Sequence, residues 1–253
     1  MNQQQPNLDH QTVFDQLWGI TNELRQKLEA RFELQLDPAT QKFQEYSSHD
    51  GNIKGSLTTF SGGEIDWLVH SWLRNPEKSF STMRLTTWLK SDIQVPHLAI
   101  EFTTLPYILF YIDYIPRTDP LIDLNYLDRY YEPVNETFLK LQTNTNLKLF
   151  TSRSVYVRLI QSPISLCFTG AAAVDTIELT RTVAHEMLDR WLTWVNEAEV
   201  VPEDTKRALT ERDLLLRRHS AERDPGNQVA AKMLGAELTD KLVRSLWGGD
   251  RIL

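Results

Sequence analysis

The sequence has little cysteine. Its 253 residues include a single one, Cys167, so neither an intramolecular disulfide nor a metal site built from several cysteines can form. This usage is typical of a reducing compartment, and it predicts a cytoplasmic protein. Cys167 lies in the apolar run from Ile164 to Phe168, where we expect a buried, unreactive thiol rather than a nucleophile.

A long apolar run is missing as well. The longest one, from Pro106 to Pro116, is interrupted by Asp113 and is shorter than the roughly 20 apolar residues of a membrane-spanning helix. The first residues, Met1 to Pro6, have neither the apolar core of a signal peptide nor the arginine and serine content of a transit peptide. We therefore expect neither a membrane span nor a leader.

Motifs for tightly bound nucleotides and metals are also absent from the sequence. No G-x-G-x-x-G motif and no P-loop motif are present. The segment from His185 to Asp189 lacks the second histidine of a zinc-protease helix, and the six histidines are scattered. We expect no bound metal, flavin or nicotinamide. The net charge of -7 argues against a nucleic-acid partner.

The residues that are present predict an α+β fold. With 41% hydrophobic residues, the chain can bury one sizeable core, and we predict one domain over residues 1–253. Apolar residues recur at helical spacing from Leu8 to Phe32, and β-branched and aromatic residues dominate from Lys42 to Ile115. Helical patterns return between about 123 and 247. This order predicts a three-layer α/β/α sandwich with a central antiparallel sheet flanked by helices.

Finer features follow from the same patterns. Both alternating residue sets of the strand from Ile65 to Leu73 contain large apolar side chains, so both faces of the sheet should be covered. We expect the strands to stop at Pro116. Two helices, from about Pro202 to Ser220 and from Gln228 to Trp247, should be joined by a turn at Asp224-Pro225-Gly226.

Acids in apolar surroundings are the main candidates for chemistry. Glu101 lies within the strand from Leu98 to Phe102, and desolvation there would favour a neutral carboxyl that donates protons near neutral pH. The alternative is a carboxylate paired with an arginine or placed at the sheet margin. Asp113 has the same ambiguity, and Asp224 before Pro-Gly is typical of a turn or cap. The pattern alone does not choose between these interpretations.

Four blocks carry a resemblance to a known family. They are Ile65 to Trp72, His97 to Phe102, Leu124 to Tyr131 and Glu211 to Asp224. In this order they resemble the red chlorophyll catabolite reductases, which belong with the ferredoxin-dependent bilin reductases, and we expect a bacterial or cyanobacterial member. With the stretches between them they cover nearly all of the chain from the first helix to Trp247.

The resemblance implies a function and two site residues. Such proteins hold an open-chain tetrapyrrole between the sheet and the C-terminal helices, and they carry no bound redox cofactor. Reduced ferredoxin supplies single electrons, and protein carboxyls protonate the pigment radical. The implied proton donors match Glu101 and Asp224 here, with Glu222 as the alternative second acid. The substrate would be red chlorophyll catabolite or a related linear tetrapyrrole.

Other functions and further residues stay open at this stage. A bilin reductase acting on a heme-derived pigment such as biliverdin and a non-catalytic pigment carrier are the alternatives, although a carrier gains nothing from burying an acid. Gln161 lies where the family varies a residue linked to product stereochemistry. Six large apolar residues are expected either to line the pocket or to belong to the core. They are Trp67, Trp72, Phe102, Tyr107, Leu109 and Phe168.

A locally basic segment suggests where ferredoxin docks. The segment from Lys206 to Arg223 contains six basic residues and three acids. Because ferredoxins of the plant type are acidic, this segment has the complementary charge. We predict docking at Arg217 and Arg218, the alternative being helix-surface residues paired with neighbouring acids. A homodimer is possible, and the sequence leaves the oligomeric state open.

Overall fold

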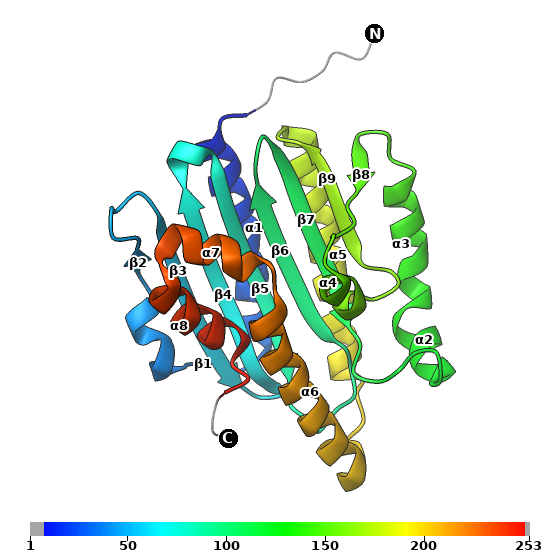
Figure 1. Ribbon diagram of the computed structural model, residues 1–253. Helices are drawn as coiled ribbons and strands as arrows, with labels where there is room; N and C mark the ends of the chain where they lie inside the picture. Colours follow the sequence, from blue (N-terminus) through cyan, green and yellow to red (C-terminus); the bar gives the residue numbers. More distant parts are fainter. Residues whose placement is uncertain (1–7, 251–253) are drawn as a thin grey trace.

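An antiparallel sheet forms the middle layer of the structure (Figure 1). The computed structural model describes residues 8–250, so the expectations for Met1 to Pro6 concern residues outside this range. Within it, nine strands join in the order β1-β3-β4-β5-β6-β7-β9-β8, with β2 also paired to β3. The strands are β1 (Gln35–Leu36), β2 (Tyr46–Ser47), β3 (Lys54–Gly62), β4 (Ile65–Asn75), β5 (Phe80–Leu89), β6 (His97–Thr104), β7 (Tyr107–Ile115), β8 (Leu147–Leu149) and β9 (Leu166–Ala171).

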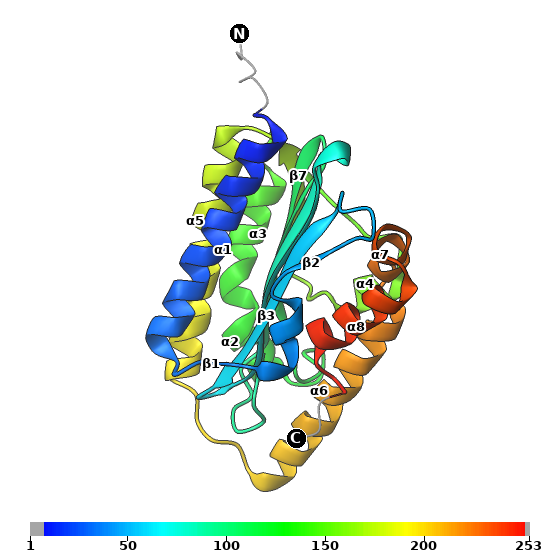
Figure 2. The same cartoon turned by 90° about the vertical axis from the view of Figure 1, so that its left-hand side faces the viewer.

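Helices cover both faces of this sheet (Figure 2). One face carries α1 (His10–Arg31), α2 (Leu124–Tyr130), α3 (Glu132–Gln142) and α5 (Val174–Asn196). The other carries α4 (Val155–Ile160), α6 (Glu203–Arg223), α7 (Gly226–Leu234) and α8 (Ala236–Trp247). Two short 3₁₀ helices, η1 (Pro38–Phe43) and η2 (Pro76–Lys78), lie in the connections. The predicted three-layer sandwich is confirmed. No helix in the described range is long and apolar enough to cross a membrane.

The two faces of the sheet differ because side chains alternate along each strand. In β5, Met83 and Leu85 point toward α1 and belong to a fully buried apolar core. Arg84 and Thr86, the residues between and after them, face the C-terminal helices and line a cavity. The layer on the α1 side is therefore an apolar core, whereas the layer on the other side contains polar side chains and a cavity.

The prediction that strands stop at Pro116 is wrong. The strands β8 and β9 join the sheet after it, and Phe168 of β9 pairs with Phe110 of β7. The sequence shows only a short apolar run from Ile164 to Phe168, and such a run cannot be distinguished from a buried helical segment by its periodicity. This segment forms strand β9 through its pairing with β7, which lies far from it in the sequence.

The helix predicted from Gln228 to Trp247 is two helices. Gly235 separates α7 from α8 and has φ 85° and ψ 154°, a conformation that residues with a Cβ rarely adopt. The chain turns there, and α7 packs beside α8 over the outer strands (Figure 1). The turn expected before α7 is confirmed, since the Gly226 amide donates to Asp224 Oδ1 at 2.8 Å.

Buried ion pairs attach α6 to the rest of the molecule. The guanidinium of Arg117, which follows β7, contacts Asp213 of α6 at 2.6 Å, and both residues are buried. Arg217, one helical turn further on, pairs with Asp66 at 2.5 Å and donates to the Trp247 carbonyl at 2.6 Å. These contacts fix the helix whose end carries Asp224.

Candidate active site

Two adjoining cavities lie between the sheet and the C-terminal helices. The first has a volume of about 290 Å³ and the second of about 530 Å³. They share seven lining residues, which are Arg84, Glu101, Thr103, Phe150, Asp224, Leu246 and Trp247. Because so much of their wall is common, they form one extended space of the size that accommodates organic ligands.

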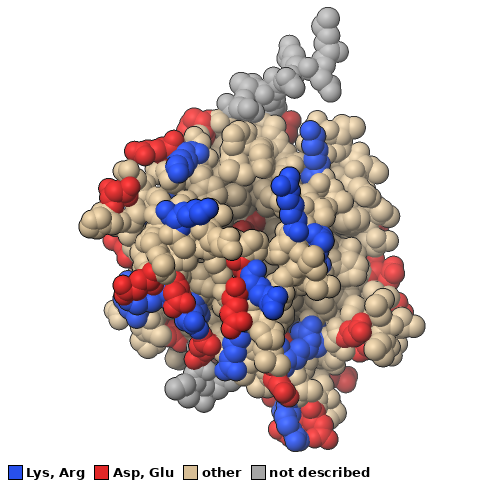
Figure 3. Space-filling view, in the orientation of Figure 1, with Lys and Arg blue, Asp and Glu red and all other residues tan. Residues whose placement is uncertain are grey.

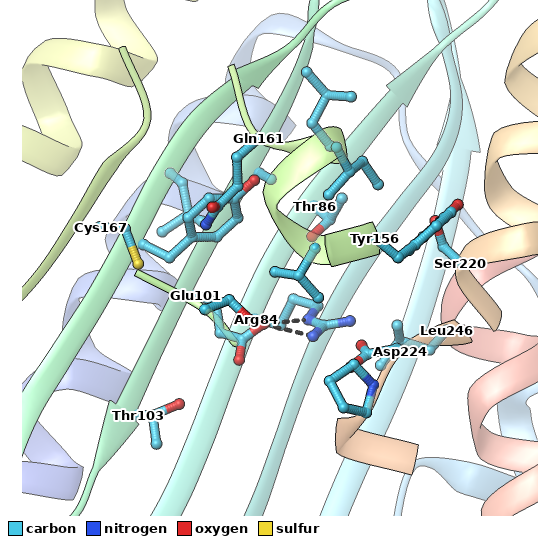
Figure 4. A pocket seen from close by; sticks show the side chains of 18 of the residues that line it. Arg84, Thr86, Glu101, Thr103, Tyr156, Gln161, Cys167, Ser220, Asp224 and Leu246 are labelled. Atoms are coloured by element: carbon cyan, nitrogen blue, oxygen red, sulfur yellow. Dashed lines mark hydrogen bonds and ion pairs between the residues drawn. The ribbon is translucent and has the colours of Figure 1, made fainter. Parts of the chain in front are cut away.

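The sheet supplies one wall of this space through every second residue of its central strands. Glu101 and Thr103 come from β6, Tyr111 from β7 and Cys167 from β9. The opposite wall consists of α4, the turn between α6 and α7, and the end of α8. Residues from distant parts of the chain thus meet around one volume (Figure 4).

Glu101 is paired with an arginine. Arg84 lies directly opposite it in the β5–β6 register, and its Nε and Nη2 atoms donate to Glu101 Oε2 at 3.0 and 2.5 Å (Figure 4). The other carboxylate oxygen accepts a hydrogen bond from Thr82 Oγ1 at 3.4 Å. The structure therefore shows the alternative left open by the sequence, a carboxylate held by an arginine.

Asp224 faces the same arginine from the helical layer. It caps the C-terminus of α6 and lines both cavities. Burial disfavours the charge of Arg84, but the carboxylates of Glu101 and Asp224 outweigh burial, and the pKa of Arg84 is raised. The structure thus brings the two predicted acids together around one cation. Glu222, the alternative second acid, is exposed and lines neither cavity.

Asp113 is a third acid, placed behind the cavity wall. It is fully buried, and its carboxylate accepts hydrogen bonds from the Tyr114 amide, the Ser162 amide, the Ser162 hydroxyl and the Tyr111 hydroxyl. Burial raises the pKa of Asp113 to about 6 against the effect of these donors. The carboxylate ties β7 to the turn after α4, which carries the cavity residue Gln161.

Two further wall residues are held neutral by their surroundings. Burial raises the pKa of the Cys167 thiol to about 12, and the nearby carboxylates act in the same direction. Burial and the Asp113 carboxylate raise the pKa of Tyr111 well above its usual value. Cys167 is an inert buried thiol as predicted, although it lies on the cavity wall.

Three of the predicted pocket residues border the cavities. Gln161 and Leu109 line the first, and Trp72 borders the second. The Trp72 ring itself packs edge to face on Phe14 of α1, with ring centroids 5.5 Å apart. Gln161 is thus placed where it can contact a ligand, whereas most of Trp72 belongs to the opposite layer.

Phe102 and Phe168 do not line the pocket, so these predictions are wrong. Both are fully buried in the apolar core on the α1 side. The physical reason is the two-residue period of a strand, in which neighbours point to opposite faces. Because Glu101 and Cys167 face the cavity, the residues that follow them must point away from it.

Trp67 and Tyr107 also lie outside both cavities. Trp67 is on the correct face, but it packs beneath the end of α8, and its Nε1 donates to the Ser245 carbonyl at 3.1 Å. Tyr107, at the start of β7, is 39% exposed. The first supports the C-terminal helix, and the second lies at the surface, so neither is a pocket wall.

The structure corrects one of the two predicted docking residues, Arg217. Arg217 is buried and engaged with Asp66, so it offers no surface to a partner. Arg218 is about half exposed, and its Nε donates to the Gly249 carbonyl at 2.8 Å. These arginines fasten the C-terminal segment to α6, because a long side chain on a packed helix face can reach neighbouring carbonyls and carboxylates.

A different group of cations lies beside the cavity. Between Glu136 and Asp175 the sequence contains no acid, and this segment supplies the lining residues Phe150, Ser152 and Tyr156. Four exposed cations flank these residues or adjoin Asp224, and we call them the basic rim: Lys148, Arg153, Arg158 and Arg223. Lysine and arginine side chains are visible on several sides of the centre of this face (Figure 3). The acid-free segment is the sequence signal that would have found Lys148, Arg153 and Arg158.

The chain is similar to proteins of one family. The family model described as red chlorophyll catabolite reductase (RCC reductase) matches residues 19–247. Red chlorophyll catabolite reductase 1, chloroplastic, from Oryza sativa subsp. japonica is 25% identical over 214 residues, which cover 78% of this chain and 65% of that protein. The chloroplastic red chlorophyll catabolite reductase from Arabidopsis thaliana is 26% identical over 249 residues, covering 88% and 77%.

The fold is similar to that of a solved structure. The crystal structure of phytochromobilin synthase from tomato in complex with biliverdin matches with a TM-score of 0.82 at 16% sequence identity. The match covers 91% of this chain and 82% of that chain. The likeness shows that the two chains share a fold.

Proposed function

The chain belongs to the red chlorophyll catabolite reductase family, and on this basis we propose that it reduces an open-chain tetrapyrrole with electrons from reduced ferredoxin. The substrate is red chlorophyll catabolite or a related linear tetrapyrrole. The observation that carries this proposal is the pair of carboxylates, Glu101 and Asp224, which face each other across Arg84 in one cavity. No redox cofactor of its own is required.

The shape and lining of the site support a large conjugated ligand. The two adjoining cavities extend over strands β3 to β9, and aromatic and aliphatic side chains form most of their walls. A few polar groups converge at the centre, as is usual where a ligand must be oriented. The tomato enzyme with the same fold holds biliverdin, which supports a linear tetrapyrrole here.

The acids suit a reaction in which electrons and protons arrive separately. One electron from ferredoxin converts the conjugated pigment into a more basic radical anion, and a carboxyl within reach then protonates it. A second electron and a second proton complete the two-electron, two-proton reduction. Positioned acids of this kind accelerate proton transfer by about 10²–10⁴-fold. After donation, the Glu101 carboxylate finds its partner in Arg84 at 2.5 Å.

The basic rim suits docking of an acidic electron donor. Its members Arg153 and Arg158 are exposed and follow the cavity residues Ser152 and Val157 in the sequence. Charge complementarity of this kind steers acidic partners and orients them. We place ferredoxin on this rim instead of on Arg217 and Arg218, so that electrons enter next to the pigment.

A bilin reductase acting on biliverdin is the second candidate, favoured by the fold of the tomato enzyme. A non-catalytic carrier fits less well, because two carboxylates in a largely apolar cavity weaken pigment binding without serving it. The single cysteine supports a reducing compartment such as a cytoplasm.

The decisive test is anaerobic incubation of the purified protein with reduced ferredoxin and a panel of linear tetrapyrroles, followed by absorbance spectroscopy. Loss of the pigment's long-wavelength absorbance with red chlorophyll catabolite supports the proposal. Turnover of biliverdin alone identifies the second candidate. Binding of pigments without turnover of any of them would contradict both.

A further inference from the structure

Arg84 occupies a special position in the cavity. Among the described residues that line the two cavities it is the only cation, and Glu101 and Asp224 are the only acids. With both acids ionised, the three side chains carry a net charge of -1. The cluster lies on the floor of the space, at the junction of the two cavities.

The Arg84 guanidinium also has unused hydrogen-bond donors. Its Nε and Nη2 atoms are used by Glu101, whereas Nη1 makes no hydrogen bond to any described residue. The Arg84 side chain is 20% exposed, and the exposed part faces the cavity. A planar guanidinium with a free edge is a site for a carboxylate.

We propose that Arg84 binds a carboxylate side chain of the substrate, and that its arrival makes Glu101 take up a proton from solvent. This inference rests on the proposed function and deepens it. Linear tetrapyrroles of this class carry propionate groups, which are carboxylates at neutral pH. A propionate beside Arg84 would bring the net charge of the cluster from -1 to -2.

The extra negative charge has to be compensated because the site is partly desolvated. Three carboxylates around one cation cannot all stay ionised at little cost, so one of them takes up a proton. Glu101 is the closer competitor, since it shares the Arg84 guanidinium directly. Proton uptake turns the paired carboxylate seen here into a neutral acid that can donate.

The other groups around Glu101 do not supply this proton. Tyr111 on β7 and Cys167 on β9 face it as neutral groups with raised pKa values. Thr82 and Thr103 contribute hydroxyls only. Asp113, behind Tyr111, adds negative charge when it is ionised and so favours uptake further. Protonation of Glu101 is thus coupled to the arrival of the substrate carboxylate.

Calorimetric titration with biliverdin and with its dimethyl ester tests the inference without turnover. The ester has the same conjugated skeleton but no carboxylate. Titrations in buffers of different ionisation enthalpy measure the number of protons taken up. We expect biliverdin to bind with net uptake approaching one proton near pH 8, and the ester to bind with no uptake. This comparison uses the unaltered chain.

Variants separate the anchor from the proton acceptor. Arg84→Gln should weaken biliverdin binding by at least about tenfold and leave ester binding unchanged. Glu101→Gln should retain biliverdin binding and lose the proton uptake. Arg129→Gln, which removes an exposed cation from α2 on the opposite layer, is the matched control and should change neither quantity.

The outcomes also distinguish this inference from the proposed function. Equal affinity and equal proton uptake for biliverdin and its ester would overturn the role of Arg84 alone, since pigment binding itself would stand. The same holds if Arg84→Gln weakens both ligands equally. If neither form binds, this inference is overturned, whereas the proposed function is decided separately by turnover of red chlorophyll catabolite.

Discussion

Arg117 and Asp213 lie 96 positions apart in the sequence and meet in the interior, where Nε and Nη2 of Arg117 contact Asp213 Oδ2 at 3.0 and 2.6 Å. His97 Nε2 lies 3.1 Å from the other carboxylate oxygen. The three residues connect β6, the segment after β7 and α6. Because α6 ends at Asp224 and β6 carries Glu101, this buried cluster helps to set the separation of the two acids that line the cavities.

Removing the charge of Asp213 should destabilise the protein strongly. Asp213→Asn leaves the Arg117 guanidinium buried without a counterion, and the expected loss of unfolding free energy is about 3 kcal/mol. Asp204→Asn is the matched control on the same helix, because its ion pair with Arg207 is almost fully exposed and should contribute little. Urea unfolding measures both. Equal stability of the two variants would contradict the anchoring role of Asp213.

His97 should make the stability fall in mild acid. Burial lowers its pKa from 6.5 to about 4, and Nδ1 accepts a hydrogen bond from the Leu89 amide at 3.0 Å. Between these pH values the unfolded chain binds a proton that the folded protein does not, so stability decreases as pH falls from 6.5 to 4. The contribution is about 3 kcal/mol. In His97→Gln this part of the pH dependence should disappear, as unfolding at several pH values will show.

Asp113 acts in the opposite direction. Its pKa in the folded protein is raised by burial from 3.8 to about 6, so between these values the folded protein binds the extra proton. This contribution is present at low pH and is lost as pH rises through about 6. Asp113→Asn should abolish the decline. Ser162→Ala removes a hydrogen bond that favours the charged form and should move the decline to higher pH; an unchanged profile in both variants would refute the assignment.

Substitution of the two proposed proton donors should separate binding from turnover. Glu101→Gln keeps the shape of the side chain, so we expect pigment binding to persist while ferredoxin-driven turnover falls by about a hundredfold or more. Asp224→Asn should have a smaller effect, since water can reach this half-buried turn residue. The double variant should lose less than the sum of the two single losses in activation free energy if both acids serve one proton-delivery network. Full activity of Glu101→Gln at every pH would make it a structural carboxylate.

Charge reversal on the basic rim should affect the electron donor alone. The double variant Arg153→Glu and Arg158→Glu should raise the KM for ferredoxin and reduce the salt dependence of turnover. Pigment affinity should stay unchanged. Arg129→Glu, on the opposite layer, is the control. An unaltered KM for ferredoxin in the rim variant would place the docking surface elsewhere.

The layers of the fold could be predicted from the sequence because they depend on local periodicity. The order of helix, sheet and helices follows from such patterns, and Glu101 and Asp224 were found through the family resemblance. The partner of Glu101 was not found. Arg84 is 17 positions away in the sequence, and a cross-strand pair depends on the register between two strands, which composition and periodicity do not specify.

The errors among the pocket residues have a simpler origin. Phe102 and Phe168 were selected for size and aromatic character, although each follows a residue predicted or shown to face the cavity. The two-residue period of a strand, applied strictly, would have excluded Phe102 once Glu101 was chosen. The docking residue Arg217 was selected from local charge, and no local pattern reveals that Asp66 is its buried partner.

The protonated state of Cys167 has a consequence for the lifetime of the protein. Single-electron chemistry in air generates superoxide and peroxide, and peroxide attacks the thiolate form of cysteine to give sulfenic acid. With a pKa of about 12, the sulfur on the cavity wall is almost entirely in the unreactive thiol form. Peroxide formed beside the pigment should therefore react slowly with the cysteine at the cavity wall.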